Sequence, residues 1–472
     1  MASWLFGMLI LATHVLGILS AVQALMSSRT SQGAIAWIIS LVTVPYLAVP
    51  AYWVFGRPRF YGYVSARGER DSVLRRVLAR YRDLMEPYLA GAKEADVLAV
   101  EKLAMMPLTS GNRTELLVDG EATFESLFAG IDRAECYILV QFFIVRDDAL
   151  GLKFKHRLQE AAERDVRVYF LYDEIGCHKL PERYLRDLHE AGVAVSAFHS
   201  SRGLRHRFQL NFRNHRKILV VDGREGWVGG FNVGVEYLGQ HPRHGHWRDT
   251  HLRLVGPSVL GLQEAFWEDW HWATGEVIGL AWTPQVTCEE SQNVVIVPSG
   301  PADPQETASL LVQHAIHSAH ERLWVTSPYF VPDHSVQDAL RLAAMRGVDV
   351  RIMIPERPDH LLVFLSAFSF LPDMLRAGVK VYRYQPGFLH QKVILIDDVA
   401  ASVGTVNLDN RSFRLNFEIT AVVPDRQFAA EVHDMLVRDF AVCRDVTLEE
   451  IESRALWRKL LSRAAYLLAP VQ

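Results

Sequence analysis

The chain has few cysteines, and this scarcity excludes two classes of protein. Its 472 residues include Cys136, Cys177, Cys288 and Cys443, which stand far apart and form no CxxC pair. A small disulfide framework and a cysteine-rich zinc site are therefore excluded. Cys136, which opens the apolar run Cys-Tyr-Ile-Leu-Val-Gln, is expected to be a buried strand residue.

An excess of positive charge is also missing. The sequence has 50 Lys and Arg against 54 Asp and Glu, so its formal net charge is −4. A chain with this balance has no general attraction to nucleic acid, and no nucleic-acid partner is expected. Half of the residues are hydrophobic, which is ordinary for a globular protein with some membrane segments. The length is sufficient for two or three domains.

Charge is absent from two long stretches near the N-terminus. Residues 5–25 and 34–55 contain no Asp, Glu, Lys or Arg. Each stretch is about as long as a helix that crosses a bilayer. Residues 1–60 are therefore predicted to form a two-helix transmembrane hairpin, with kinks at Pro45 and Pro50. A cleaved signal peptide is the alternative, but it lacks a basic n-region and would be followed at once by a second hydrophobic run.

Positive charge returns directly after the second stretch. Arg57, Arg59, Arg67 and Arg70 follow it, whereas the loop between the two stretches carries only Arg29. This bias predicts that the large C-terminal part is cytoplasmic and that both ends of the hairpin lie inside. Residues 61–106 are expected to be a juxtamembrane connector, with a helix over residues 75–90 that rests on lipid.

The sequence contains one pattern twice. His215-Arg-Lys217 leads after four residues to Asp222, and His390-Gln-Lys392 leads after four residues to Asp397. Six residues after each Asp comes the same coda, Gly229-Gly-Phe-Asn232 in one copy and Gly404-Thr405-Val-Asn407 in the other. Five residue types that recur at identical spacing indicate a repeated structural unit with a shared purpose.

The apolar run between Lys and Asp in each copy predicts a buried strand. Side chains two residues apart on a strand point to the same face, so His215 and Lys217 share a face, as do His390 and Lys392. A neutral imidazole can attack phosphorus, and a protonated imidazole can donate to a leaving alkoxide. Lysine and asparagine side chains can donate hydrogen bonds to the other phosphate oxygens.

The acidic residues are harder to assign from the sequence. Asp222 and Asp397 lie too far along their strands to share a phosphate easily, and they are expected to orient the site or balance its charge. Asp249 and Glu418 occupy comparable places in the two copies. Each is expected either to hydrogen-bond a catalytic histidine or to form a salt bridge at a strand end.

The two motifs resemble those of the phospholipase D superfamily, and most closely those of bacterial cardiolipin synthases. The resemblance extends to Asn211–Lys217, His246–His251, Pro298–Pro301, Ser327–Pro332 and Gly404–Glu418. It implies a metal-independent phosphatidyltransferase of the bacterial inner membrane that needs no cofactor. It also implies that two phosphatidylglycerol molecules react to give cardiolipin and glycerol.

Strands alternate with helices in both copies, so the predicted fold is α/β. We expect two phospholipase D-like repeats, residues 107–285 and 286–450, packed around one shared active site. Predicted helices cover residues 121–128, 151–164, 307–319 and 335–346, and predicted strands cover residues 137–145, 166–172, 323–331 and 348–354. The catalytic set of that site is His215, Lys217, Asp222, His390, Lys392 and Asp397. The phosphate-binding or supporting set is Asn232, Asn407, Thr405, Asp249 and Glu418.

The symmetry of the repeats leaves the choice of nucleophile open, and the resemblance favours His215. A hydrolase, either a phospholipase D or an anchored nuclease, could use the same residues, and a catalytically inactive lipid-binding scaffold is a third class. Phosphatidylethanolamine as donor and another alcohol as acceptor also stay open.

Four further features allow two interpretations each. His241, His244, His246 and His251 cluster near Asp249 but match no standard zinc spacing, so no metal is expected. Residues 361–371 predict a buried helix or a lipid-chain groove. The tail, residues 451–472, predicts a basic amphipathic helix that lies on the membrane or docks on the protein. An arginine cluster before His215 is either a solvated loop or a funnel for anionic headgroups: Arg202, Arg205, Arg207, Arg213 and Arg216.

Overall fold

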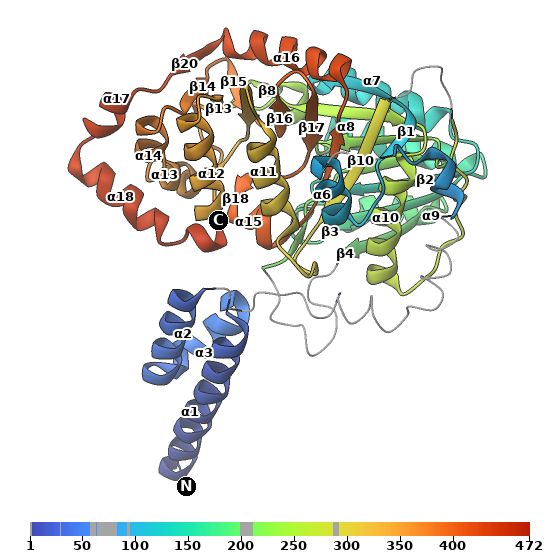
Figure 1. Ribbon diagram of the computed structural model, residues 1–472. Coiled ribbons are helices and arrows are strands. Elements are labelled where there is room, and N and C mark those ends of the chain that lie inside the picture. The colour runs from blue at the N-terminus through green and yellow to red at the C-terminus, as the bar shows by residue number, and fades with distance from the viewer. Residues whose placement is uncertain are drawn as a thin grey trace.

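The computed structural model describes residues 2–28, 30–56, 63, 83–91, 95–198, 211–286 and 292–472. A large α/β body contains two similar halves, and a long helix, α1, with the shorter helices α2 and α3 extends from it near the N-terminus (Figure 1). The first half, residues 109–274, contains β1 (Thr109–Val118), α7 (Asp119–Asp132), β2 (Tyr137–Phe142), α8 (Ala149–Glu163), β3 (Arg167–Asp173), α9 (Glu182–Glu190), β4 (Ala194–Phe198), β5 (Arg213–Asn214), β6 (Ile218–Val221), β7 (Glu225–Gly229), η3 (Val235–Leu238), β8 (His246–Arg248), β9 (Thr250–Val255) and α10 (Val259–Thr274).

The second half, residues 292–440, repeats the order of the main strands and helices and inserts the short helix α13. It contains β10 (Gln292–Ser299), α11 (Thr307–Ser318), β11 (Arg322–Thr326), β12 (Phe330–Val331), α12 (His334–Met345), β13 (Asp349–Pro355), α13 (Leu361–Ala367), α14 (Leu371–Arg376), β14 (Lys380–Tyr384), β15 (Gly387–Leu389), β16 (Val393–Ile396), β17 (Ala400–Gly404), β18 (Leu408–Asp409), α15 (Asn410–Arg414), β19 (Asn416–Val423) and α16 (Arg426–Phe440). After it come β20 (Cys443–Asp445), α17 (Leu448–Glu452), α18 (Leu456–Tyr466) and η4 (Ala469–Val471).

The strands of both halves form one continuous sheet. Its order is β20-β14-β13-β11-β16-β17-β19-β10-β1-β9-β7-β6-β2-β3-β4, and β5 attaches to β19. Counted outward from the central pair of β10 and β1, the strands of the two halves correspond one to one. The matching pairs are β19 and β9, β17 and β7, β16 and β6, β11 and β2, β13 and β3, and β14 and β4. The halves join where β1 runs antiparallel to β10, with Thr109 opposite Val294. The predicted α/β fold with two repeats is therefore confirmed.

The motif strands divide their side chains between two cores, as the strand period requires. In β6, Ile218 and Val220 enter a core that both halves share, whereas Leu219 and Val221 enter the outer core of the first half. In β16, Val393 and Leu395 likewise enter the shared core. Both faces of each motif strand are therefore covered by protein, which fixes the direction in which the neighbouring His and Lys point.

Two local predictions are wrong. The strand predicted over residues 323–331 is interrupted, because β11 ends at Thr326 and β12 begins only at Phe330. Pro328 lies between them and has no N–H to donate to a sheet. Cys136 is exposed, since it precedes the first residue of β2.

The second hydrophobic stretch is not a single helix. α1 (Ala2–Ser27) includes an apolar span over Trp4–Ser27 that is long enough to cross a membrane, the one such helix among the described residues. The next stretch breaks at Val44 into α2 (Ser31–Thr43) and α3 (Pro45–Ala51), followed by a π-helical turn, η1 (Tyr52–Gly56). Pro45 has no N–H to continue α2, so the chain breaks at one of the two prolines where a kink was predicted, and the second stretch is not one continuous helix.

α3 turns back along α1. Gly17 of α1 lies beside Leu41 and Pro45, where α2 ends, and His14 lies beside Tyr46. Farther along, the Nε1 atom of Trp53 donates to Ser20, nearer the C-terminal end of α1. α2 therefore runs down α1 and α3 returns toward the body (Figure 1). The thirteen residues of α2 rise roughly 20 Å, which is less than the roughly 30 Å core of a bilayer.

The connector is described only in part. It includes η2 (Glu86–Tyr88) and α6 (Ala95–Ala104). Of the helix predicted over residues 75–90, residues 75–82 lie outside the described residues. α6 contributes Val100 and Ala104 to the core that both halves share, so the connector is anchored in the body before β1 begins.

Candidate active site

Two short parallel strand pairs cross between the halves and set the site. β5 of the first half pairs with β19 of the second, and β8 of the first half pairs with β15 of the second. β5 and β15 directly precede the two motif histidines in the sequence. The backbone N–H of His215 donates to Phe417 O at 2.8 Å, and that of His390 donates to Arg248 O at 2.8 Å. Each histidine is therefore held by the main chain of the opposite half.

The residue after each acceptor carbonyl is an acid that contacts the histidine ring. His215 Nδ1 lies 2.8 Å from Glu418 Oε2, and His390 Nδ1 lies 2.6 Å from Asp249 Oδ2. These acids were expected either to contact a histidine or to form a salt bridge at a strand end, and the structure has the histidine contact. In each pair the histidine comes from one half and the acid from the other. A carboxylate on Nδ1 holds the ring so that Nε2 is available for chemistry.

Other side chains fix both acids. Glu418 Oε1 accepts hydrogen bonds from Ser412 Oγ at 2.9 Å and Asn416 Nδ2 at 3.0 Å. Asp249 Oδ1 accepts from the N–H of Thr250 at 2.8 Å. Gly230, in the coda of the first motif, leaves space for the Asp249 carboxylate, since a Cβ there would lie 1.9 Å from Oδ1. The glycine of this coda is therefore required by close packing.

The two lysines are buried beside the histidines. Lys217 Nζ donates to His215 O at 2.6 Å, and Lys392 Nζ donates to His390 O. Burial lowers the pKa of Lys217 to about 7 and that of Lys392 to about 8. Each lysine charge also acts on the other, which shows that the two motifs meet in one electrostatic environment.

Burial likewise determines the state of the histidines. It lowers the pKa of His215 to about 4, although Glu418 opposes the shift. It holds the pKa of His390 well below the usual range, and the charges of Lys392, Lys217 and His215 add to that effect. Burial raises the pKa of Asp249 to about 6. For Glu418, burial acts upward, but His215 and Lys217 outweigh it, and its pKa is lowered. Both rings are therefore neutral at pH 7 in the free site.

Asp222 and Asp397 are not in this site, which corrects the prediction for both. Asp222 accepts backbone N–H groups from residues 135–137 at 2.7 to 2.8 Å, and Asp397 accepts them from residues 320–322 at 2.8 to 3.3 Å. Five residues of strand place Asp222 roughly 16 Å from Lys217. Both acids have positive φ, 54° and 47°, in tight turns where Asp is tolerated. They fix the starts of β2 and β11.

The coda residues lie behind the histidines. Asn232 Oδ1 accepts the N–H of Ile144 at 3.0 Å, and its Nδ2 donates to Tyr237 at 2.9 Å. Asn407 is buried, and its Oδ1 meets no donor among the described residues. Thr405 Oγ1 accepts the N–H of Ile419 at 2.9 Å and helps to lower the pKa of Glu418. That the two asparagines donate hydrogen bonds to the phosphate of a substrate stays a prediction.

A buried charge network behind the site was missed by sequence reasoning. Asp269 of α10 accepts from Arg216, Asn214 and Gln141 at 2.7 to 2.9 Å, and also from Tyr63 at 2.9 Å. Arg216 is 4% exposed, so its predicted place in a headgroup funnel is wrong. Arg216 and Asp269 are 53 residues apart in the sequence, so no local pattern predicts that they form a pair. Only the fold brings α10 beside β6.

The second half has a counterpart that uses a different donor. Asp439 of α16 accepts from Arg248 Nε and Nη2, both at 2.8 Å, and from Gln391 Nε2 at 3.0 Å. Gln391 occupies the position in the second motif that Arg216 occupies in the first. The guanidinium on Asp439 therefore comes from the other half of the molecule.

The remaining site predictions concern arginines and metals. Arg202, Arg205 and Arg207 lie outside the described residues, and Arg213 lies on β5, where burial lowers its pKa. Within the described part of the chain, no group of three or more His, Cys, Asp or Glu is arranged to hold a metal ion. Of the histidine cluster, His246 contacts Asp119 at 3.1 Å, and His251 is buried beside Asp249.

The paired motifs, the repeated α/β halves and the crossed histidine–acid contacts define a phospholipase D-like protein. The chain matches the family "Cardiolipin synthase, PLD-like domain" over residues 127–241 and 312–440. It also matches "Phospholipase_D-nuclease N-terminal" over residues 15–57. The matches to the first family extend over half of the chain, and the chain belongs to this cardiolipin synthase family of the phospholipase D superfamily.

Curated relatives are similar over nearly the whole chain. Cardiolipin synthase A of Pseudomonas aeruginosa is 50% identical over 470 residues, which is 98% of this chain and 96% of the relative. Cardiolipin synthase A of Pseudomonas putida is 47% identical over 473 residues, 99% of this chain and 98% of the relative. Among solved structures, phosphatidylserine synthase of Haemophilus influenzae shares the fold with a TM-score of 0.60 at 15% identity, over 80% of this chain and all of that one.

Proposed function

We propose that this protein is a membrane-bound phosphatidyltransferase that makes cardiolipin and glycerol from two phosphatidylglycerol molecules. The observation that carries the proposal is the crossed arrangement of two His–acid pairs, His215 with Glu418 and His390 with Asp249. It provides two neutral imidazoles, both with Nδ1 engaged, within one buried cationic environment. The family and the relatives' names support the lipid product.

In the first step, Nε2 of His215 attacks the phosphorus of the donor lipid. The phosphorus–oxygen bond to glycerol breaks as a phosphorus–nitrogen bond forms, and the glycerol oxygen takes a proton from Nε2 of His390. His215 is the preferred nucleophile because its partner Glu418 has a lowered pKa and stays ionised. An ionised acid stabilises the positive charge that develops on the attacking ring.

In the second step, neutral His390 removes a proton from a hydroxyl of the acceptor lipid. That oxygen attacks phosphorus, the phosphorus–nitrogen bond breaks, and cardiolipin forms. His390 begins the first step protonated, because the bound phosphodiester brings a negative charge that raises the pKa of the ring. Lys217 and Lys392 would offset the charge on the non-bridging oxygens.

Product analysis tests this function. Vesicles of phosphatidylglycerol are incubated with the purified protein in detergent or bilayer, and the lipids are separated by chromatography. Equal amounts of cardiolipin and glycerol support the transferase, whereas phosphatidic acid as the main product supports a hydrolase. Vesicles that contain phosphatidylethanolamine, or an added alcohol, test for another donor or acceptor. Unchanged lipid would contradict both enzyme classes.

We propose further that the protein sits in the bacterial inner membrane with its body in the cytoplasm. α1 crosses once, while α2 and α3 enter the bilayer from the body side and return to it. Exposed apolar side chains on both, such as Ile39 and Leu47, suit contact with lipid. The basic residues after the second stretch favour a cytoplasmic body. In this topology the N-terminus is periplasmic, whereas a spanning hairpin would place it inside.

Cysteine labelling distinguishes the two topologies. Cys136 is exposed on the body and reports its side. With the other native cysteines replaced, Ser31→Cys should react with an impermeant maleimide from the same side as Cys136, and Trp4→Cys from the opposite side. A spanning hairpin gives the reverse for both variants and would exclude the returning segment.

A further inference from the structure

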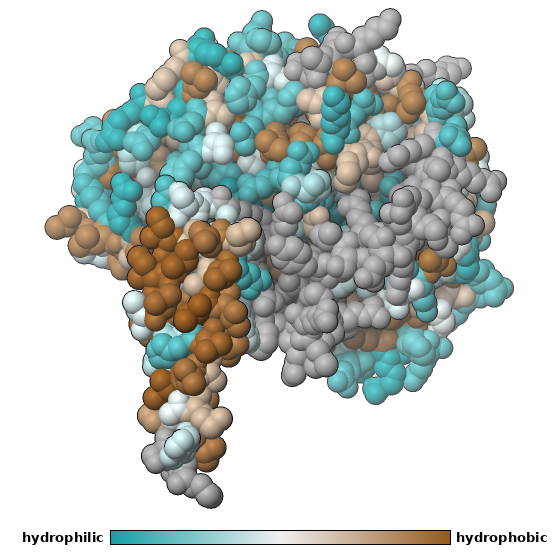
Figure 2. Space-filling model, turned by 60° about the horizontal axis from the view of Figure 1, so that its bottom comes forward, coloured by the Kyte–Doolittle hydropathy of each residue, from teal (hydrophilic) through white to brown (hydrophobic). Residues whose placement is uncertain are grey.

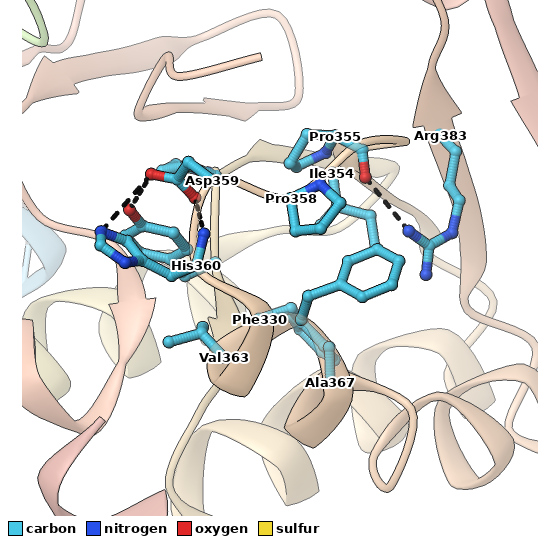
Figure 3. A pocket seen from close by; sticks show the side chains of 12 residues that line it. Phe330, Ile354, Pro355, Pro358, Asp359, His360, Val363, Ala367 and Arg383 are labelled. Atoms are coloured by element: carbon cyan, nitrogen blue, oxygen red, sulfur yellow. Dashed lines mark hydrogen bonds and ion pairs between the residues drawn. The ribbon is translucent and has the colours of Figure 1, made fainter. Parts of the chain in front are cut away.

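The second half contains a cavity next to the site, at the place where it departs from the first half. α13 is inserted between β13 and α14, whereas β3 of the first half leads to α9 without such a helix. The inserted segment lines a small cavity that is partly open to solvent (Figure 3). Its walls are mainly apolar, with Phe330, Ile354, Pro358 and Val363 among them.

A buried arginine forms one end of the cavity. Arg383 of β14 is 1% exposed, and its ring neighbours Phe364 and Phe368 each lie 4.9 Å from the guanidinium. Nη1 donates to Pro355 O at 3.1 Å, while Nη2 is buried and meets no acceptor among the described residues. Burial lowers the pKa of Arg383 to about 10, so the group stays cationic at pH 7. The equivalent position on β4 is Ala197.

Among the described residues, no carboxylate forms an ion pair with this cation. Two acids act on it, Glu356 and Glu450, and both are already paired with Arg444. A buried charge without a counter-ion is costly, and removing such a charge from water requires a ligand or partner to offset the loss. The geometry therefore indicates an anion that is absent from the protein itself.

The opposite end of the cavity carries Tyr329 and Asp359, which link it electrostatically to the second motif. Asp359 accepts the hydroxyl of Tyr329 at 2.6 Å, and its charge acts on both His390 and Lys392. Tyr329 precedes β12, which pairs with β18 directly after Asn407 of the second motif. On the arginine side, Tyr384 next to Arg383 packs against Leu389, which precedes His390. The cavity thus extends from the second motif to Arg383.

We propose that this cavity binds the headgroup of the acceptor phospholipid, with its phosphodiester on Arg383. The inference rests on the proposed transfer function. Donor and acceptor are the same lipid, but the acceptor's phosphorus does not react and must be held away from the histidines by the length of a glycerol. Asp359 and Tyr329 bind hydroxyls of that glycerol, which presents its attacking hydroxyl to His390. The apolar walls keep water from competing for the phospho-histidine.

The surface near α13 fits a ligand that remains partly in the bilayer. Leu361 and Leu362 of α13 are exposed, and α13 packs on α18. α18 exposes Leu456, Trp457, Leu460 and Leu461 and carries basic residues among them. Brown apolar groups protrude from the teal surface of the body in Figure 2, apart from those of the N-terminal helices. The acyl chains would stay in lipid while the headgroup enters.

The test separates the two half-reactions. Exchange of radiolabelled glycerol into phosphatidylglycerol reverses the first step and needs no acceptor lipid, whereas cardiolipin synthesis needs both sites. Arg383→Gln should lower cardiolipin synthesis about 10- to 100-fold, the range for loss of a charged hydrogen bond, while glycerol exchange changes less than about threefold. The share of phosphatidic acid among the products should rise, because water meets a longer-lived intermediate.

A matched control and a second variant complete the experiment. Arg351 on the neighbouring strand β13 also stacks on two rings, Trp324 at 4.4 Å and Phe440 at 5.6 Å, but lies outside the cavity. Arg351→Gln should leave the ratio of synthesis to exchange unchanged. Asp359→Asn, at an exposed position, should lower the same ratio. The acceptor site would be overturned if both variants lost synthesis and exchange equally, or if both variants kept normal synthesis. Wild-type protein without either activity would instead contradict the transferase function.

Discussion

The two halves use the same histidine chemistry but hold it in place with different side chains. In the first half, Arg216 of the motif binds Asp269 of its own half. In the second half, Gln391 stands at that position, and Asp439 receives its guanidinium from Arg248 of the first half. Both arginines therefore belong to one half. The reacting groups are therefore arranged symmetrically in the two halves, whereas the buried arginines that support them both come from the first half.

The largest expected effect comes from removing either histidine. His215→Asn removes the nucleophile, and His390→Asn removes the proton donor. Each variant should lower cardiolipin synthesis by about 10³-fold or more, because no other group takes over the lost role. A substrate with a good leaving group breaks the symmetry, since it needs no proton. His390→Asn should then accumulate phospho-histidine, detected with a labelled phosphate, and His215→Asn should not. Accumulation in His215→Asn alone would reverse the assigned roles.

The two acids should show the next largest effect. Glu418→Gln and Asp249→Asn remove the anion from Nδ1 and are expected to lower kcat about 10²- to 10⁴-fold with little change in KM. Because Glu418 stabilises the positive charge on the attacking ring, Glu418→Gln should slow formation of the phospho-enzyme. Asp249→Asn should slow its breakdown. Single-turnover kinetics measure the two steps separately, and equal effects on both steps in both variants would contradict the division.

The pH dependence should follow the buried acid and the buried lysines. Asp249, with a pKa of about 6, becomes protonated below that pH and no longer accepts from His390. Lys217 and Lys392, with pKa values of about 7 and 8, lose their charge above those values and bind phosphate less well. We expect kcat/KM to be bell-shaped and to fall about tenfold per pH unit on each side. Lys217→Arg, which removes the lower of the two lysine pKa values, should extend the alkaline limb, and an unmoved limb would contradict the assignment.

The asymmetric arginines offer a test of stability. Arg216→Gln and Arg248→Gln each leave a buried aspartate without its cation, and we expect each to lower the free energy of unfolding by about 3–5 kcal/mol. Arg248→Gln removes a contact between halves, so it should also separate their unfolding into two transitions. Denaturation followed by tryptophan fluorescence measures both quantities. A single transition in Arg248→Gln would show that the shared core alone couples the halves.

The smallest effect is expected from the aspartates that close the two motifs. Asp222→Ala removes the acceptor of three backbone N–H groups and places Ala at φ 54°, so it should cost about 1–3 kcal/mol of stability. Activity per folded molecule should stay within about twofold, in contrast to the histidine variants. Asp222→Asn, which tolerates the turn, is the control. Loss of activity without loss of stability would return Asp222 to the site.

Local sequence patterns predicted the features that depend on neighbours along the chain. The spacing of His215 and Lys217 and the apolar run behind them were sufficient to predict a buried strand, and helices such as α8 and α12 lie where their periodicity places them. The same logic failed where one residue interrupts a pattern. Pro328 divides a predicted strand, and Pro45 divides a predicted membrane helix.

Features that depend on distant strands could not be predicted in the same way. The site acids were candidates, but their crossing between halves follows from β5–β19 and β8–β15, which join segments more than 140 residues apart. Asp269 and Asp439 gave no signal, because each lies on a helix whose partners are fixed only by tertiary packing. Arg383 was missed because its burial depends on α13, which has no counterpart in the first half.

The antiparallel pairing of β1 with β10 has a consequence for how lipid arrives. It fuses the two halves into one continuous sheet, and the crossed His–acid contacts fasten them a second time. A hinge motion that separated the two halves would have to break both the β1–β10 pairing and the His–acid contacts. A substrate would therefore have to reach the histidines without any separation of the two halves.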